Sequence, residues 1–377
     1  MRSRLLGLRT TGALVLTGAL ALTSAACTAG DNGPLDPHAS ASMPGASGPA
    51  HPTTASGSAT AGGSKSPTQP ITTTQPIKTF ASKSCHNTVF AQVQGNRQYG
   101  FTACGSAPYS RIYAIVGDGL HWKRTPLSAR GIPLAAAGGT YLLYSAGSGN
   151  VSVLHRAEHG KVNKFTVQQG PPNTFVGAIT SAKGWWANWS EPTFNQVWQA
   201  HTLRGNEFAT VSSPKYAQHV SLTMIAGKPV QAWVETTGLY VGTPKGATWT
   251  RGRVTSDQVG PPVVFKLGTH TAVAYPDYTH NSARLAVLTG TRWSVRSLGS
   301  LGSSDTSLVS AGGRAADAVV AWQSSTGLGL ARLADAHWAT TTYGTAKDRA
   351  LATTGRAVVR EDGSILLLGT QTSRIIG

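Results

Sequence analysis

The sequence predicts an all-β fold, a seven-bladed β-propeller of four-stranded antiparallel blades over residues 77–377. One observation is an aromatic residue that returns about every 43 positions, the signature of an array of similar units. These residues are Trp122, Phe165, Phe208, Trp249, Trp293 and Trp338, at spacings of 43, 43, 41, 44 and 45. The other observation is that strand-forming residues alternate between joints of Gly, Asn, Asp or Pro, with no helical spacing after Ala26. A sandwich or a pair of small β domains is the alternative, but neither predicts so steady a period.

Each repeat predicts four strands, of which the second ends in a polar or acidic residue and the last begins at the periodic aromatic residue. Second strands of three consecutive repeats are Val230–Glu235, Ala272–Asp277 and Ala318–Gln323. Six repeats have four strands, whereas the seventh has three, which we predict as Leu351–Gly355, Ala357–Glu361 and Ser364–Gly369. We expect Ile77–Ser82 to supply the missing outer strand and close the ring, which removes exposed sheet edges.

The N-terminus predicts export. Residues 1–26 combine three arginines with an apolar run that ends in small residues, the layout of a secretory signal peptide. Cys27 follows Ser24-Ala25-Ala26, which resembles the bacterial lipobox and implies a diacylated Cys27. Leu is usual where Ser24 stands, so ordinary cleavage after Ala26 is the alternative.

Residues 27–76 predict a tether between this anchor and the propeller. Thr28–Pro76 consists almost wholly of Ser, Thr, Ala, Gly and Pro, and such a segment cannot bury enough apolar surface to fold. As a coil it would span on the order of 40 Å. Its composition resembles that of actinobacterial lipoproteins. We therefore expect a lipid-anchored protein on the extracytoplasmic side of the cell membrane.

The three cysteines fit this location. An exported chain tends to pair its cysteines, and Cys85 and Cys104 both fall in the first repeat. A disulfide between them would crosslink the seam of the ring and contribute roughly 3 kcal/mol. Cys27 is then the odd cysteine, which lipidation accounts for.

The chain is strongly basic, with a net charge of +17. Removing residues 1–26 removes three arginines, which leaves 29 Lys and Arg against 15 Asp and Glu, a charge of +14. Such a charge attracts anionic head groups, wall polymers or acidic polysaccharide. No basic stretch is dense enough for a nucleic-acid arm, so we expect no nucleic-acid partner.

The few acidic residues gather where propeller ligands bind. Turns from the second to the third strand and loops between blades share one face, because neighbouring strands are antiparallel. We predict a ligand face that contains Glu191, Glu235, Asp277, Glu361, Asp362, Trp189 and Arg130. Asp257, Asp305 and Asp348 fall in the loops between blades. The alternative is that loops merely tolerate charge, and a slip of one strand would move residues to the opposite face.

Four tryptophans crowd into the third repeat, at positions 185, 186, 189 and 198, beside Asn188 and Glu191. Indole faces next to amide and carboxylate groups can hold sugar rings. Because Trp185 and Trp186 must point to opposite faces, some of these rings are core residues on any interpretation.

The repeats resemble the sialidase and Asp-box propellers, whose hairpin carries Ser-x-Asp-x-Gly-x-Thr-Trp. Gly246-Ala247-Thr248-Trp249 keeps one half of this motif, and Asp118-Gly119 with Trp122 keeps another part. Gly290 with Trp293 keeps the turn and the ring. The resemblance covers roughly residues 85–370 and implies that the box is a folding element remote from any active site.

A sialidase-like exo-glycosidase would need an arginine cluster, a tyrosine nucleophile with a glutamate, and an aspartate. Arg130 with Ile132-Pro133 departs from the family's Arg-Ile-Pro by an inserted Gly131. The pairs Asp277 with Tyr278 and Glu235 with Tyr275 are the candidates for acid and nucleophile.

Motifs for zinc proteases, serine hydrolases, phosphate loops and metal-binding cysteine pairs are absent from the sequence. We therefore expect no cofactor and no metal. The sequence favours a monomeric, non-catalytic binding or scaffolding lipoprotein for an envelope glycan or a protein partner. The sialidase-like exo-glycosidase is the alternative.

Overall fold

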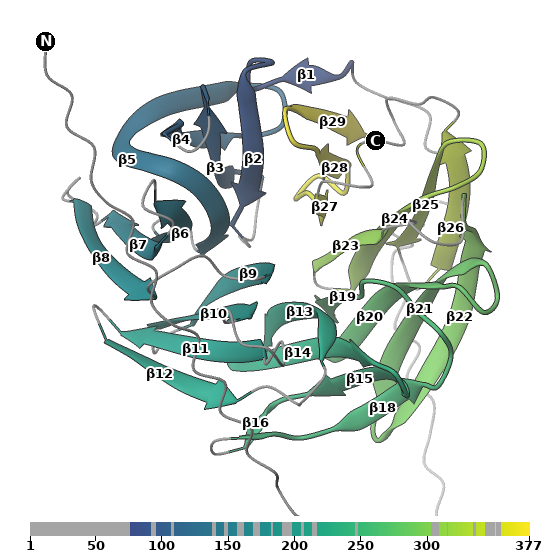
Figure 1. The fold of residues 1–377 in the computed structure, drawn as a ribbon. Helices are drawn as coiled ribbons and strands as arrows, with labels where there is room; N and C mark the ends of the chain where they lie inside the picture. The colour runs from purple at the N-terminus through teal and green to yellow at the C-terminus, as the bar shows by residue number, and fades with distance from the viewer. Residues whose placement is uncertain are drawn as a thin grey trace, which may run out of the picture. The chain divides into compact units, whose positions relative to one another are not determined.

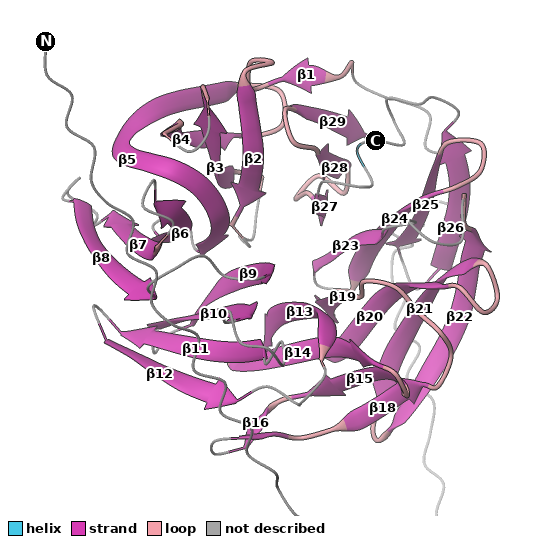
Figure 2. Ribbon diagram, in the orientation of Figure 1, coloured by secondary structure: helices cyan, strands magenta, loops and turns pink. Residues whose placement is uncertain are grey.

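The computed structural model describes residues 76–377 with gaps, and its ordered elements are strands (Figure 2). The gaps are residues 92–95, 107–108, 138–140, 147–149, 157–161, 169–173, 182–183, 191–197, 205–206, 213–216, 246–247, 303–308, 315, 335–336, 344–350 and 352–355. Residues 1–75, which contain the predicted signal peptide, Cys27 and most of the tether, lie outside the described part. Across the part of the chain that is described, no helix is long and apolar enough to span a membrane.

The strands form antiparallel sheets that follow one another around a ring, as in a β-propeller (Figure 1). Three sheets are simple meanders of four consecutive strands. They are β9 (Thr174–Ser181), β10 (Gly184–Ser190), β11 (Trp198–Arg204) and β12 (Glu207–Ser212); β19 (Val263–Leu267), β20 (His270–Asp277), β21 (Ser282–Thr289) and β22 (Arg292–Ser300); and β23 (Val309–Arg314), β24 (Asp317–Gln323), β25 (Leu328–Ala334) and β26 (His337–Tyr343). The first strand of each lies nearest the centre of the ring (Figure 1).

A fourth sheet carries a small extra hairpin between its third and last strands. Its strands are β13 (Gln218–Ile225), β14 (Lys228–Glu235), β15 (Gly238–Gly242) and β18 (Gly252–Thr255), and the hairpin is β16 (Pro244–Lys245) with β17 (Thr248–Trp249). The last strand that the sequence predicts to begin at Trp249 is thus divided in two, because Thr250 and Arg251 interrupt it between β17 and β18.

The first seven strands after β1 form one continuous sheet. They are β2 (Cys85–Phe90), β3 (Gln98–Cys104), β4 (Arg111–Gly117), β5 (Trp122–Ala137), β6 (Tyr141–Ala146), β7 (Val151–Arg156) and β8 (Val162–Gln168). The long strand β5 pairs with β4 up to Arg130 and with β6 from Gly131 onward. It is therefore the outer strand of one set of four strands and the inner strand of the next.

The last sheet combines both ends of the described chain. Its strands are β27 (Arg356–Val359), β28 (Ile365–Leu368), β29 (Thr372–Ile376) and β1 (Lys78–Thr79), in that order from the centre (Figure 1). Lys78 pairs with Ser373 and Thr79 with Thr372, which confirms the predicted closing strand. The strand order predicted within this repeat is wrong by one strand. Arg356–Val359 is the first strand of the sheet rather than the second, and Thr372–Ile376 is a further strand that the prediction lacks.

The closing sheet is joined to the first strands by packing, hydrogen bonds and a disulfide. Leu366 and Ile375 pack against Phe90 and Trp122. The indole Nε1 of Trp122 donates to Oγ of Ser373 at 3.0 Å. The predicted disulfide is confirmed: Cys85 and Cys104 are bonded and lie directly opposite each other on β2 and β3.

Four of the periodic aromatic residues, Trp122, Phe208, Trp293 and Trp338, are the first or second residue of an outer strand, as the sequence predicts. Phe165 lies in the middle of β8, and Trp249 ends β17 of the extra hairpin rather than beginning the outer strand β18. The tryptophans pack toward the preceding sheet. Trp293 packs on a cluster that includes Val234 and Leu239 of the β13–β18 sheet. Trp338 packs on the cluster that contains Leu285 of the β19–β22 sheet. Trp249 packs edge-on against Trp186 with ring centroids 6.4 Å apart. Among the described residues, each tryptophan of the period thus packs between two neighbouring sheets.

Candidate functional site

Two of the predicted ligand-face residues lie where the sequence places them. Glu235 ends β14 and Asp277 ends β20, so each stands at the turn from the second to the third strand of its sheet. Asp257 lies in the loop between β18 and β19, and that loop bonds to the end of β20: the Tyr278 nitrogen donates to the Gln258 carbonyl at 2.9 Å. The loop between sheets and the turn after the second strand therefore meet at one face.

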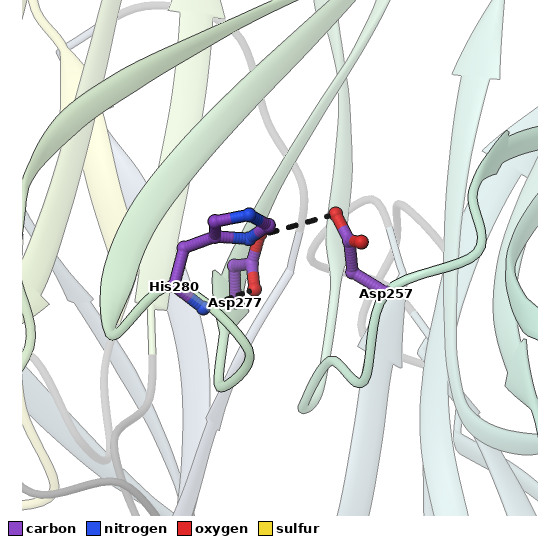
Figure 3. Close-up of side chains that lie close together, drawn as sticks. All are labelled: Asp257, Asp277 and His280. Atoms are coloured by element: carbon purple, nitrogen blue, oxygen red, sulfur yellow. Dashed lines mark hydrogen bonds and ion pairs between the residues drawn. The ribbon is translucent and has the colours of Figure 1, made fainter.

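Asp277 is the buried centre of a polar cluster at this meeting point (Figure 3). Its carboxylate is 0 % exposed. Oδ1 accepts a hydrogen bond from the backbone nitrogen of His280 at 3.0 Å, and Oδ2 lies 2.9 Å from the Nδ1 of His280. The turn Asp277–His280 is thus closed by its own first residue, because an Asp side chain readily accepts from the backbone a few residues later.

Arg284 supplies the opposite charge. Its Nε lies 2.9 Å from Oδ2 of Asp277, an ion pair without the alignment of a hydrogen bond. A second carboxylate, that of Asp257, lies 4.0 Å from the Arg284 guanidinium and 3.8 Å from the imidazole of His280. Burying a carboxylate is costly unless it is paired, so Arg284 and His280 explain why Asp277 is tolerated in the interior.

The side chains of this cluster differ in their access to solvent. His280 is 48 % exposed and Asp257 is 26 % exposed, whereas Asp277 is enclosed. Asp257 is itself oriented by Thr255, whose hydroxyl donates to Oδ2 at 2.8 Å. Two accessible polar groups are therefore held in place by buried ones, which is the arrangement that a preorganised binding site requires.

Tyr275 lies deeper in the same interface and is not placed to act as a nucleophile. It stands directly opposite Arg284 on β20 and β21, and its side chain is buried. Burial raises the pKa of the Tyr275 hydroxyl far above its ordinary value, although the charge of Arg284 opposes this. The buried hydroxyl makes no hydrogen bond to Glu235, whose carboxylate contacts Trp233 and Arg251 instead, which argues against the predicted pair of Tyr275 with Glu235.

The carboxylate of Glu235 also has partners within the protein. Its carboxylate accepts from the indole nitrogen of Trp233 at 2.7 Å and pairs with Arg251 at 2.6 Å. The guanidinium of Arg251 lies 4.0 Å over the ring of Tyr240, which in turn stacks on Trp233. Glu235 thus positions a half-exposed Arg251 at the same end of the neighbouring sheet.

The carboxylates of Asp257 and Asp277 and the imidazole of His280 have ligand atoms within 4.8 Å of one another, a spacing that suits a metal ion. Arg284, however, places a permanent positive charge against the same carboxylate oxygen that the ion would need. The guanidinium of Arg284 already pairs with Asp277 and lies near Asp257, so the geometry fits an ion-pair network better than a metal centre.

Glu361 and Asp362 do not belong to this face, and their predicted placement is wrong. They lie in the turn between β27 and β28, the first and second strands of their sheet, at the opposite end from the turn after a second strand. Glu361 pairs there with Arg314, which ends the first strand β23. Asp362 closes its own turn by accepting from the Ser364 nitrogen at 3.0 Å. The predicted placement is wrong because the prediction lacks the final strand Thr372–Ile376, so each earlier strand of the repeat is numbered one too high.

The other predicted residues are distributed as follows. Glu191 lies outside the described residues, and Trp189 lies in β10 with a side chain that is not described. Arg130 is exposed in β5, next to the turn between β3 and β4, and so on the predicted face. Trp186, which the sequence offered as part of a sugar platform, packs against Trp249 in the interior.

His280 and Arg284 are the functional-site residues that sequence reasoning missed. A signal for His280 exists in hindsight, since Asp277-Tyr278-Thr279-His280 has the spacing of a turn closed by its aspartate. Arg284 carries no comparable signal, because its partner is fixed by strand pairing rather than by spacing.

Comparison with known proteins supports the fold and leaves the family open. No family model matches the chain, and no curated protein sequence matches it.

Solved structures do resemble it at low sequence identity. Virginiamycin B lyase from Staphylococcus aureus matches with a TM-score of 0.52 and 9 % identity, over 80 % of this chain and 98 % of that one. YCF48 bound to a D1 peptide matches with a TM-score of 0.50 and 11 % identity, over 80 % and 95 %. A six-bladed fucose-binding lectin from Aleuria aurantia matches with a TM-score of 0.43 and 12 % identity, over 70 % and 97 %. The first two likenesses show that the chain is a β-propeller of four-stranded antiparallel blades.

Proposed function

We propose that this chain is a non-catalytic binding module, a seven-bladed propeller held at the extracytoplasmic side of the membrane by a lipid on Cys27. Its ligand, an envelope glycan or a protein partner, binds the face formed by the turns after second strands and the loops between sheets. The blade count follows if the seven-stranded sheet is two blades that share β5. A crystal structure would test the count directly.

The observation that carries this proposal is the arrangement of buried and accessible polar groups around Asp277. The buried carboxylate and Arg284 neutralise each other, while His280 and Asp257 remain accessible at the surface. A site that must bind without reacting needs rigid polar groups and no activated one. Each described acid at this face is held by a neighbour: Asp277 by His280 and Arg284, Glu235 by Arg251, and Asp257 by Thr255.

The structural neighbours are compatible with such a role. Propellers of similar shape include a protein bound to a peptide and an enzyme, so the fold alone does not choose between binding and catalysis. The choice rests on the burial of Tyr275 and on the carboxylates of Glu235 and Asp277, which already have partners within the protein. These are three of the four residues that the sequence offers for a sialidase-like mechanism, Tyr278 being the fourth.

Co-sedimentation with isolated cell envelopes tests the binding face. Asp257→Asn and His280→Gln change exposed groups of the candidate site, and we expect each to weaken saturable binding of the full chain. Asp362→Asn is the matched control, since it also removes an exposed carboxylate, but from the opposite end of a sheet. Equal loss in the control, or no loss in the site variants, would contradict the proposed face.

The lipid anchor has an independent test. Detergent phase partitioning of cell extracts should place the full chain in the detergent phase and Cys27→Ala in the aqueous phase. A Cys27→Ala variant that stays in the detergent phase would show that Cys27 is not the anchor.

A further inference from the structure

A row of directly paired residues crosses the first four strands of the seven-stranded sheet. Cys85 pairs with Cys104, Cys104 with Arg111, and Arg111 with Arg130. Directly opposed residues project from the same face of a sheet, with Cβ atoms about 5 Å apart. The two arginines are therefore neighbours, and they stand at the end of the sheet that carries the turn between β3 and β4.

Arg111 and Arg130 are both exposed, and neither makes an ion pair or a hydrogen bond within the described residues. Like charges directly opposite each other destabilise a sheet. A third arginine adds to the charge: Arg124 lies on the same face, with its guanidinium 4.8 Å over the ring of Tyr113 and 3.4 Å from Sγ of Cys85. The row thus concentrates positive charge that no described carboxylate offsets.

An exposed aromatic ring lies beside this charge. Tyr109 precedes Arg111 by two residues and is 65 % exposed, the largest value among the large hydrophobic side chains described. Ser110 between them is buried. Tyr109 and Arg111 are thus two exposed residues on either side of one buried residue, at the start of β4.

The backbone around the arginines is held firmly. The Ser110 carbonyl accepts from the Gly131 nitrogen at 2.9 Å, and the Ser110 hydroxyl donates to the Gly105 carbonyl at 3.2 Å. Gly131 has φ +138°, and a Cβ there would lie 2.0 Å from the Ser145 carbonyl oxygen. The disulfide fixes the other end of the row. The arginines are thus presented by a rigid scaffold, which lowers the entropic cost of binding.

Protection of the sheet edge does not account for this row. Charged residues on an outer strand deter edge-to-edge pairing, which would explain Arg130. Arg111, however, lies on the third strand β4, which has a neighbour on each side. An edge-protection role also leaves the exposed ring of Tyr109 without a purpose.

We propose that Tyr109, Arg111 and Arg130 form a binding site for a phosphate-bearing glycan. One guanidinium saturates the two oxygens of a carboxylate, whereas a phosphate group has more oxygens and up to two charges, enough for both arginines. The ring of Tyr109 offers a flat apolar face for the attached sugar. This assignment rests on the proposed binding function, and it names the ligand chemistry and a second location on the same face.

Three immobilised polymers with one backbone test the proposal: dextran, carboxymethyl dextran and phosphorylated dextran at equal substitution. We expect the full chain, purified in detergent, to bind phosphorylated dextran most tightly. Arg111→Gln with Arg130→Gln should weaken this binding at least about tenfold, because two charge-assisted contacts are lost. Tyr109→Ala should weaken the affinity for phosphorylated dextran several-fold, and the dependence of that affinity on salt concentration should stay the same.

The matched control is Lys123→Gln with Arg292→Gln, which removes the same charge from exposed outer-strand positions elsewhere. This control should bind phosphorylated dextran within about twofold of the unaltered chain, as expected for charges without specific contacts. Equal weakening in the control, equal affinity for carboxymethyl dextran, or binding only to phosphatidylglycerol vesicles would each overturn the assignment. Envelope binding that still depends on Asp257 and His280 would then leave the proposed function intact.

Discussion

The indole nitrogen of Trp122 donates a hydrogen bond to the hydroxyl of Ser373 at 3.0 Å, across a sequence separation of 251 residues. The same hydroxyl donates to the Gly119 carbonyl at 2.9 Å. This contact joins the last sheet to the hairpin of the first one, so the two ends of the described chain meet in a single hydrogen-bonded unit. The stability of the ring therefore depends on residues near both ends.

The disulfide at this seam should stabilise the protein measurably. Cys85→Ser with Cys104→Ser removes a crosslink between residues 19 positions apart, and we expect a loss of roughly 3 kcal/mol in the free energy of unfolding. Urea unfolding with and without reductant measures it. Reductant should lower the stability of the unaltered chain and leave that of the double variant unchanged.

Asp277→Asn should destabilise the fold more than a surface change would. The substitution leaves Arg284 facing a neutral group in the interior, and removing one partner of a buried pair costs about 3 kcal/mol or more. Asp257→Asn, which alters a partly exposed carboxylate of the same cluster, should cost less than about 1 kcal/mol. If thermal unfolding ranks the two variants in the reverse order, the cluster is not organised around Asp277.

Gly131→Ala tests the bend in β5. The added methyl group would meet the Ser145 carbonyl in a backbone conformation with φ +138°, so we expect a loss of about 2 kcal/mol or more. Gly290→Ala is the control, since Gly290 has φ +61° but no atom within 4 Å of the added methyl group. Similar losses in both variants would mean that the close approach at Gly131 does not matter.

The turn at Asp118 predicts a dependence on acid. Burial works against the charged form, but hydrogen bonds from the backbone nitrogens of His121 and Leu120 prevail and lower the pKa of Asp118 to about 2. A carboxylate with a lowered pKa contributes stability above its ordinary pKa near 4, and this contribution is lost as the pH falls through 2.

The stability advantage of the unaltered chain over Asp118→Asn should therefore be greatest above pH 4 and should narrow toward pH 2. Chemical unfolding at several pH values measures this difference. A difference that stays constant from pH 5 to pH 2 would contradict the role of the charge.

The Asp-box resemblance gains a physical meaning from this turn. Asp118 accepts from the two residues before the periodic tryptophan, and Gly119 with φ +100° lies against Leu366 of the closing sheet. Asp118, Gly119 and Trp122, the motif positions kept in this repeat, thus each have a role in folding. The motif therefore says nothing about a ligand.

The sequence predicted the ring architecture because its signals are local and repeated. The wedge formed by Trp249, Trp293 and Trp338 recurs once per sheet, so spacing alone reveals it. The closing strand and the disulfide were also predictable, since an incomplete last repeat needs a partner and few cysteines were available to pair.

The candidate site was only half predictable. Asp257 and Asp277 fall at turn positions that alternation locates, but Arg284 joins them through strand pairing, which no spacing reveals. The prediction places Glu361 at the wrong end of its sheet because it does not include Thr372–Ile376 as a strand. A shift of one strand in an antiparallel sheet moves every turn to the opposite face.

Hydrogen–deuterium exchange of the full chain, with and without isolated envelope glycan, tests the central claim most directly. The account predicts that bound glycan slows exchange in residues 256–262 and 277–282, the loop and turn that hold Asp257, Asp277 and His280. It predicts no change in residues 360–364 at the opposite end of the closing sheet. Protection of residues 360–364 without protection of the other two segments would contradict the proposed binding face.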